Sequence, residues 1–157
     1  MSRIKITSTS NPQFKEYKKL LTKKHRDLTN QFLVHGKHLV EEAGKVPNTL
    51  VETLTSNNNQ SGILLSKELM RELSVDNAYY DVIGVCSHTK QNIKNNNKIL
   101  VLDQIQHPNN VGSLLRTALA FGFNEVYASL DTSDFYHERS IRASQGAIFK
   151  LALHKVD

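Results

Sequence analysis

The chain has 157 residues, and 39% of them are hydrophobic, which excludes a wholly disordered segment and suffices for a folded core. Its 20 Lys and Arg against 15 Asp and Glu give a formal charge of +5, which favours a polyanionic partner such as nucleic acid but also occurs in proteins that bind none. The single cysteine, Cys86, excludes an internal disulfide and a thiolate zinc cluster. No signal peptide is visible and no apolar run approaches ~20 residues, so we expect a soluble cytoplasmic protein without a membrane partner.

The first predicted element is a basic amphipathic helix. Ser10 or Asn11 can cap its start, where Pro12 is tolerated, and the pattern continues to roughly Leu28. One apolar face of this helix is formed by residues whose successive spacings are three, four and seven, namely Phe14, Tyr17, Leu21 and Leu28. Much of the remaining surface is basic, with Lys15, Lys18, Lys19, Lys23, Lys24 and Arg26. These residues can hold RNA phosphates or form an ordinary solvated face, and the pattern alone does not decide between the two.

After this helix the sequence alternates between predicted strands and helices. Strands are expected at residues 32–35, 50–55 and 81–86, and helices at residues 36–43 and 66–73. This order is typical of an α/β layering.

Two asparagine-rich stretches interrupt the pattern. Residues 57–62 are predicted to form a surface loop inside a domain. Residues 91–98 contain one apolar residue in eight and are predicted to be a linker. We therefore place a domain boundary there, which gives domains at residues 1–92 and 98–157.

The second domain begins with the short apolar run at residues 99–103, which predicts a strand buried on both faces of a parallel sheet. A helix at residues 111–121 follows and is stopped by Gly122. The remaining expected elements are a strand at 125–129, a helix at 138–143 and a strand at 148–154.

Polar residues cluster just after the first strand of this domain, where open α/β sheets place their ligands. Asn110 lies at the helix entrance, and Arg116 follows six residues later as an isolated cation in an otherwise apolar helix. That spacing predicts that Arg116 lies close to the face that Asn110 begins. The alternative is that Asn110 is a plain N-cap and Arg116 an ordinary surface residue.

The stretch from residue 102 to residue 122 strongly resembles the first signature of the SpoU/TrmH family of RNA ribose methyltransferases. In that family a strand leads to a Pro-x-Asn-apolar-Gly turn and then to a helix that carries Arg-Thr-Ala and ends in Phe-Gly. The matching positions are Pro108, Asn110, Val111, Gly112, Arg116, Thr117, Ala118, Phe121 and Gly122. His107 departs from the pattern, since an acidic residue usually precedes this proline.

Two further stretches are similar to the same family. Residues 142–147, Arg-Ala-Ser-Gln-Gly-Ala, match its second motif, in which Gly146 permits a left-handed turn or a close backbone approach. Ser8 and Asn11 before the basic helix, and the Phe-Leu-Val-x-Gly pattern at residues 32–36, resemble the N-terminal RNA-binding domain of the family. His35 stands where that pattern usually has a glutamate.

The resemblance implies a chemistry and a set of roles. Such enzymes transfer a methyl group from S-adenosylmethionine to a ribose 2′-hydroxyl of RNA. The family assigns proton removal to the arginine, here Arg116, and the holding of the ribose or of the arginine to Asn110. Because a guanidinium hardly deprotonates in proteins, we expect Arg116 to donate hydrogen bonds to the developing alkoxide, while the proton leaves through a phosphate or water.

The remaining roles concern the cofactor and the RNA. Ser144 and Gly146 are expected to contact the cofactor, although the resemblance implies that most of the cofactor pocket lies beyond Asp157. Arg142 is expected to join the six basic residues of the first helix in binding RNA. No metal site is expected, because the histidines lack metal-ligand spacing.

The implied fold is α/β. It comprises an N-terminal ribosomal-protein-like α/β RNA-binding domain and an incomplete α/β-knot methyltransferase domain. Family members continue with a third signature and a knotted tail that this sequence lacks, so we expect a truncated chain that binds S-adenosylmethionine poorly. The complete enzyme is expected to be a homodimer, and its substrate to be rRNA rather than tRNA.

Two rival hypotheses stay open. The chain can be a non-catalytic RNA-binding module derived from such an enzyme. It can also be an unrelated nucleotide-binding α/β protein, but no G-x-G-x-x-G or G-K-[ST] phosphate loop favours that hypothesis.

Overall fold

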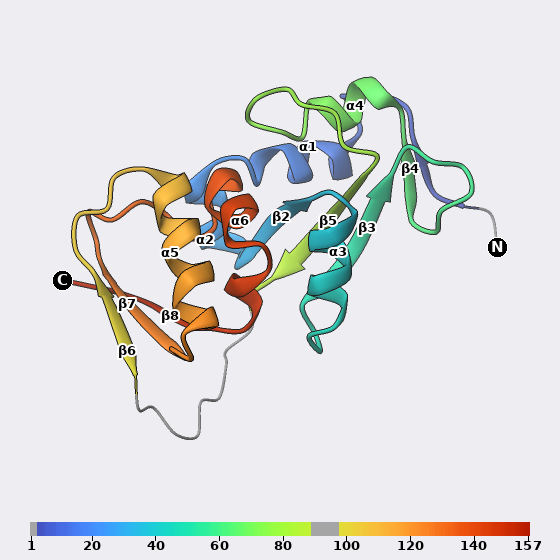
Figure 1. Cartoon of the computed structure of the whole chain (residues 1–157). Helices are drawn as coiled ribbons and strands as arrows, with labels where there is room; N and C mark the ends of the chain where they lie inside the picture. Colours follow the sequence, from blue (N-terminus) through green and yellow to red (C-terminus); the bar gives the residue numbers. More distant parts are fainter. Residues whose placement is uncertain (1–2, 89–97) are drawn as a thin grey trace. The chain divides into compact units, whose positions relative to one another are not determined.

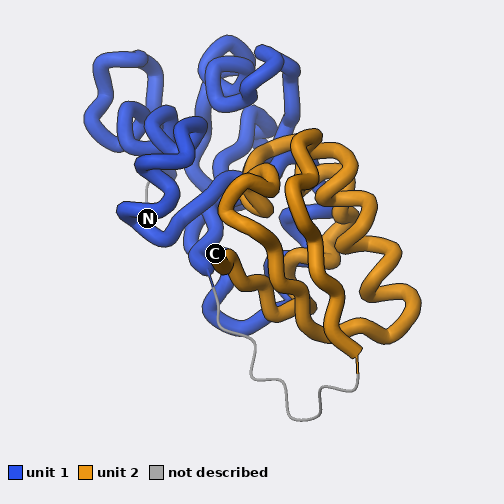
Figure 2. Tube along the Cα trace, turned by 90° about the vertical axis from the view of Figure 1, so that its left-hand side faces the viewer, with its two compact units in different colours: residues 1–88 blue, residues 89–157 orange. Residues whose placement is uncertain are grey.

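A computed structural model of the chain describes residues 3–88 and 98–157. The chain divides into two compact units, residues 1–88 and residues 89–157 (Figure 2). Most of the predicted linker at residues 91–98 lies outside the described residues. In the described ranges no helix has the length and apolar content needed to cross a membrane.

Unit 1 is built on a five-stranded sheet with the order β1-β4-β3-β5-β2 (Figure 1). Its strands are β1 (Lys5–Ile6), β2 (Gln31–His35), β3 (Leu50–Thr55), β4 (Ile63–Leu65) and β5 (Val82–Ser87). β1, β4 and β3 run parallel, whereas β5 pairs antiparallel with both β3 and β2. The three strands predicted from the sequence are confirmed. β1 and β4 were not predicted, because two or three residues are too few to show an alternating pattern.

Helices of the described part of unit 1 accompany this sheet, namely α1 (Pro12–Lys19), α2 (Lys23–Thr29), α3 (Lys37–Gly44) and α4 (Lys67–Arg71). The main core joins α1 and α4 to one face of the sheet, through Phe14, Met70 and Ile83 among others. On the other face Gly84 lies against Val34 of β2 and Val40 of α3. The sheet is therefore covered on both faces.

The prediction of one continuous helix from residue 12 to residue 28 is wrong. Asn11 caps the start as expected, since its Oδ1 accepts hydrogen bonds from the backbone N–H groups of Gln13 and Phe14 at 2.9 and 3.2 Å. The helix then ends at Lys19, and a second helix begins at Lys23. Leu28, assigned to the apolar face of a continuous helix, is 76% exposed because the break removes it from that face.

The break is stabilised by Arg26. Its side chain is 5% exposed, and Nη1 donates a hydrogen bond of 2.9 Å to the carbonyl of Leu20, at the end of α1. Arg26 therefore satisfies a carbonyl at the helix break and does not lie on the exposed basic face that was expected to contact RNA.

Unit 2 contains a parallel sheet in the order β6-β7-β8. Its elements are β6 (Ile99–Leu102), α5 (Pro108–Ala120), β7 (Glu125–Ser129), α6 (Glu138–Ser144), a 3-10 helix at Ala147–Phe149 and β8 (Ala152–Val156). The α/β class and the parallel sheet are confirmed. The expected strand at residues 148–154 is wrong at its start, because Gln145 and Gly146 both adopt left-handed backbone angles and lead into the 3-10 helix first.

β6 is not buried on both faces, as its apolar run predicted. It lies at the edge of the sheet, and Ile99 and Val101 are 48% and 69% exposed. The alternate residue Leu102 is buried. The described part of unit 2 thus covers one face of this strand and leaves the other open.

Candidate functional site

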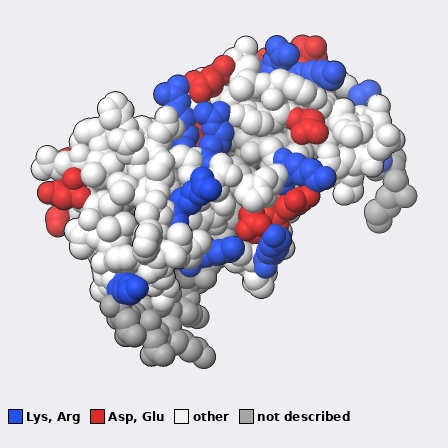
Figure 3. Space-filling view, viewed as in Figure 1, with Lys and Arg blue, Asp and Glu red and all other residues white. Residues whose placement is uncertain are grey.

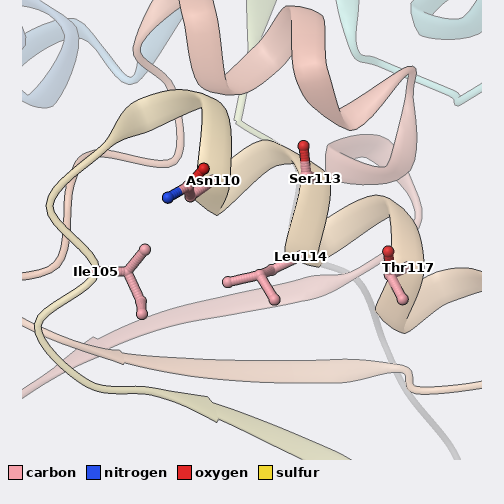
Figure 4. Close-up of a pocket in the computed structure, with 5 residues that line it drawn as sticks. All are labelled: Ile105, Asn110, Ser113, Leu114 and Thr117. Atoms are coloured by element: carbon pink, nitrogen blue, oxygen red, sulfur yellow. The ribbon is translucent and has the colours of Figure 1, made fainter.

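A pocket of about 330 Å³ lies beside α5 in unit 2. Four of its lining residues, Asn110, Ser113, Leu114 and Thr117, come from one face of the helix, where spacings of three and four residues align side chains. The fifth, Ile105, belongs to the loop after β6. Figure 4 shows Ile105 and Leu114 projecting toward each other beneath Asn110. The volume is at the lower end of the range of about 300–1,000 Å³ for ligand pockets.

Asn110 is the third residue of α5 and not its N-cap. The helix begins at Pro108, whose fixed φ suits the first helical position, and His107 occupies the N-cap position without a side-chain cap. The backbone N–H groups of Asn110 and Val111 both bond to the carbonyl of His107. The Asn110 carboxamide is therefore not used for capping, and it lines the pocket.

Arg116 is exposed and does not line this pocket. The prediction that Arg116 lies close to the face of Asn110 is wrong, because six residues of a helix correspond to a rotation of about 120° and a rise of about 9 Å. Arg116 is therefore turned away from the helix face that carries Asn110. It is nearer to Ser113, about 60° round the helix. Among the described residues Arg116 forms no hydrogen bond or ion pair, which leaves its guanidinium available to a ligand.

The loop that carries Ile105, on one side of the pocket, is held by the hydroxyl of Thr132. This residue was not identified from the sequence. Thr132, 3% exposed, accepts a hydrogen bond from the Ile105 N–H at 3.2 Å and donates one to the Leu102 carbonyl at 3.2 Å. The Ser133 N–H bonds to the Ile105 carbonyl at 2.8 Å. Lys155 in β8 donates from Nζ to the carbonyls of Ser129 and Thr132. These residues were missed because their role depends on two loops meeting in space, which leaves no local pattern.

The two residues predicted to contact the cofactor do not line this pocket. Ser144 is 1% exposed, and its Oγ donates to the carbonyl of Ile141 at 2.8 Å. Gly146 is buried, with φ +91°, at the start of the 3-10 helix. The left-handed turn predicted for Gly146 is confirmed.

Asp157 does not line this pocket either. It follows β8 and is exposed, whereas every lining residue of the pocket lies between residues 105 and 117. The pocket beside α5 therefore does not test the expectation that most of the cofactor pocket lies beyond Asp157, which stays a prediction.

Gly112 brings α5 and α6 unusually close. A Cβ at this position would lie 2.2 Å from the carbonyl oxygen of Ser140 and 2.6 Å from the Cβ of Ala143. Only glycine fits such a contact without a shift of one helix. The helix that carries Asn110 and Arg116 is thereby set against α6.

The exposed basic surface in unit 1 is partly neutralised by acidic side chains. Lys18 pairs with Glu72 at 2.5 Å, Lys19 with Glu16 at 2.6 Å and Lys23 with Asp27 at 2.5 Å. Lys15 and Lys24 are exposed and form no ion pair within the described residues. In unit 2, Arg142 is half-exposed and lies 3.8 Å from Glu138. No cluster of three metal-ligating side chains occurs in the part of the chain that the structure describes.

Comparison with known protein families matches both units. Residues 97–157 match the SpoU rRNA Methylase family, and residues 11–94 match the MRM3-like substrate binding domain. The chain is 33% identical over 155 residues to the 23S rRNA (guanosine(2553)-2'-O)-methyltransferase RlmP of Bacillus subtilis, an alignment that covers 93% of this chain and 62% of that protein.

Solved structures agree with these matches. An RNA 2'-O ribose methyltransferase superposes with a TM-score of 0.78 at 27% identity, over 98% of this chain and 66% of that one. An AdoMet-bound rRNA methyltransferase from Sinorhizobium meliloti superposes with a TM-score of 0.81 at 22% identity, over 96% and 64% respectively. The chain thus spans less than two-thirds of the length of these relatives.

Proposed function

Because the chain belongs to the SpoU rRNA methylase family and carries an MRM3-like substrate binding domain, we propose that it acts in the S-adenosylmethionine-dependent methylation of a ribose 2′-hydroxyl of RNA. The observation that carries this proposal is the disposition of α5. It presents the Asn110 carboxamide in a pocket and, about 120° further round the helix and about 9 Å along it, the exposed guanidinium of Arg116, which has no partner among the described residues.

These two side chains act on the acceptor. The Asn110 carboxamide has both donors and an acceptor, so it can hold a ribose hydroxyl in one orientation. The Arg116 guanidinium remains protonated and donates hydrogen bonds to the 2′-oxygen as negative charge develops there. The hydroxyl proton leaves to a phosphate or to water. Arg116 is therefore an electrostatic catalyst and not a base.

S-adenosylmethionine, when bound, supplies an activated methyl group. Ser144 and Gly146 do not fit a direct contact with it, because the serine hydroxyl is buried and already bonded and the glycine is buried in the turn after α6. No step of the proposed mechanism passes through these two residues.

The proposed substrate is ribosomal RNA, since the Bacillus subtilis relative is named for a nucleoside of 23S rRNA. Lys15, Lys18, Lys19, Lys23, Lys24 and Arg142 are proposed to contact phosphates, which would position the RNA without selecting a base. A homodimer is proposed for the active form, and the cytoplasm, where rRNA is available, as its location.

The proposal is tested by methyl transfer from labelled S-adenosylmethionine to bulk RNA. Arg116→Ala should lower the rate by about 100-fold or more, which is the usual effect of removing one donor to a developing oxyanion, and should leave RNA affinity unchanged. Arg139→Ala removes an exposed arginine of the neighbouring helix α6 and serves as the matched control. Equal rates for Arg116→Ala and the control would contradict the assignment. RNA binding without any methyl transfer would favour a non-catalytic RNA-binding module.

A further inference from the structure

We propose that unit 1 binds one unpaired RNA nucleotide in a second pocket, at the carboxyl ends of its three parallel strands. This proposal rests on the proposed function, because it names the surface by which the substrate is held. The pocket, called here the strand-end pocket, has a volume of about 350 Å³, and its lining includes Lys5, Thr7, Ser56, Asn58, Leu65 and Ser66.

The topology gathers hydroxyl groups at this edge. β1, β4 and β3 are neighbours and run parallel, so their carboxyl ends lie side by side. Thr7 follows β1, Ser66 follows β4 and Ser56 follows β3. Open α/β sheets bind ligands outside the carboxyl ends of parallel strands. The hydroxyls and the Asn58 amide can bond to a base edge or to a 2′-hydroxyl.

The wall formed by the loop at residues 57–62 is held by one arginine. The Arg3 guanidinium donates to the carbonyl oxygens of Gly62 at 2.8 Å, Asn58 at 2.9 Å and Gln60 at 2.6 Å. A loop fixed in this way has little freedom left to lose when a ligand binds. The strand-end pocket is therefore preformed.

An aromatic ring and two cations adjoin the pocket. The Tyr79 hydroxyl lies 2.7 Å from Oγ of the lining residue Ser56, and the tyrosine is 37% exposed. Lys67 Nζ and Arg71 Cζ each lie 5.7 Å from the centroid of this ring. Figure 3 shows basic side chains gathered over α4, with acidic side chains beside them.

This combination fits a nucleotide of a single-stranded segment. The aromatic ring can stack on the base, the cations can contact the phosphate, and the pocket polar groups can read the ribose or the base edge. Among the described residues Lys5, Lys67 and Arg71 form no ion pair, as is also true of Lys15 and Lys24 in α1 and α2. The first three differ from Lys15 and Lys24 in that Lys5 lines the strand-end pocket and Lys67 and Arg71 lie over the Tyr79 ring.

The test is a titration of the full ¹⁵N-labelled chain with an unstructured ten-nucleotide RNA, followed by NMR and by fluorescence anisotropy. Amide shifts should change at Thr7, Ser56 and Ser66. Tyr79→Ala should weaken affinity about tenfold, a typical loss for one stacked base, and the Lys67→Ala/Arg71→Ala double variant should weaken it as well. Tyr79→Phe keeps the stacking surface and should stay within about threefold of the wild type.

Lys45→Ala is the control for loss of one charge, because Lys45 is exposed and pairs with Glu42 on α3. Its affinity should match that of the wild type, and amide spectra check that every variant is folded. Binding with shifts only over α1 and α2, and with no effect of Tyr79→Ala, would overturn this inference and leave the proposed function intact. Failure to bind any RNA would overturn both. Equal binding of free nucleoside monophosphates at this pocket would overturn it too, by assigning the pocket to a small molecule.

Discussion

Gly112 gives the clearest prediction for a single residue. Gly112→Ala should destabilise unit 2 by about 1–3 kcal/mol, because the new Cβ collides with the Ser140 carbonyl and forces α5 and α6 apart. Thermal denaturation of the variant measures this loss.

Gly44→Ala is the matched control, since its Cβ would meet only Leu50 Cδ2 at 3.8 Å, and it also lies in a helix. Alanine favours a helix over glycine, so this control should be neutral or slightly stabilising. A Gly112→Ala variant as stable as the Gly44→Ala variant would show that the two helices are not in close contact.

Because the Cys86 thiol is buried, we expect the chain to lose stability at alkaline pH. Burial raises the pKa of the thiol from 9.0 to about 12, so the folded chain keeps its proton at pH values where the unfolded chain has lost it. The contribution of the Cys86 thiol to the free energy of unfolding is therefore complete below about pH 9 and is lost as the pH rises toward 12. Urea denaturation at pH 8 and pH 10.5 should show a smaller drop for Cys86→Ala than for the wild type. Identical drops would mean that the thiol is not buried.

Single residues were predictable where the local chain decides their role. Asn11 and Gly146 were identified because capping and left-handed turns depend on near neighbours. Arg26 and Ser144 were assigned to RNA and cofactor, but both are buried, because burial depends on distant segments that spacing does not reveal.

Among the elements, the break between α1 and α2 depends on Arg26. Arg26→Ala should destabilise unit 1 by about 1–3 kcal/mol, because it leaves the Leu20 carbonyl without its buried donor. Lys24→Ala removes a charge from the same helix at an exposed position and should change stability by less than about 0.5 kcal/mol. Urea denaturation distinguishes the two, and equal stabilities would show that the buried hydrogen bond contributes nothing.

The basic surface of α1 and α2 predicts a graded salt dependence of RNA binding. Lys15→Ala/Lys24→Ala removes two lysines that form no ion pair in the described ranges and should reduce the slope of log K against log salt by about 0.7 per lost phosphate contact. Lys19→Ala/Lys23→Ala removes two paired lysines and should reduce it less, because each already interacts with a carboxylate. Equal slopes in both double variants and the wild type would exclude this surface from RNA binding.

Elements were predictable where they are long and periodic. The strands β2, β3, β5, β6 and β7 and the helix α6 agree with the sequence pattern to within one or two residues. The starts of α5 and β8 were misplaced, because Pro108 begins a helix earlier than the apolar pattern suggests and the 3-10 helix delays the strand.

At the scale of the whole chain, the α/β class and the family were predictable, since both depend on the order of elements and on short signatures. The exposure of β6 was not predictable from the sequence. An apolar run indicates that a strand has two apolar faces, but it does not show whether other described residues cover both of them. Val101 is 69% exposed for this reason.

The activity proposed for the chain is methyl transfer to a ribose oxygen of RNA. The most direct measurement is to incubate RNA with the protein and methyl-labelled S-adenosylmethionine, and then to hydrolyse the RNA with alkali. A 2′-O-methyl group blocks cleavage of the adjoining phosphodiester, so the label should appear in alkali-resistant dinucleotides, and Arg116→Ala should remove it. Label recovered in single nucleotides would place the methyl group on a base and contradict the account.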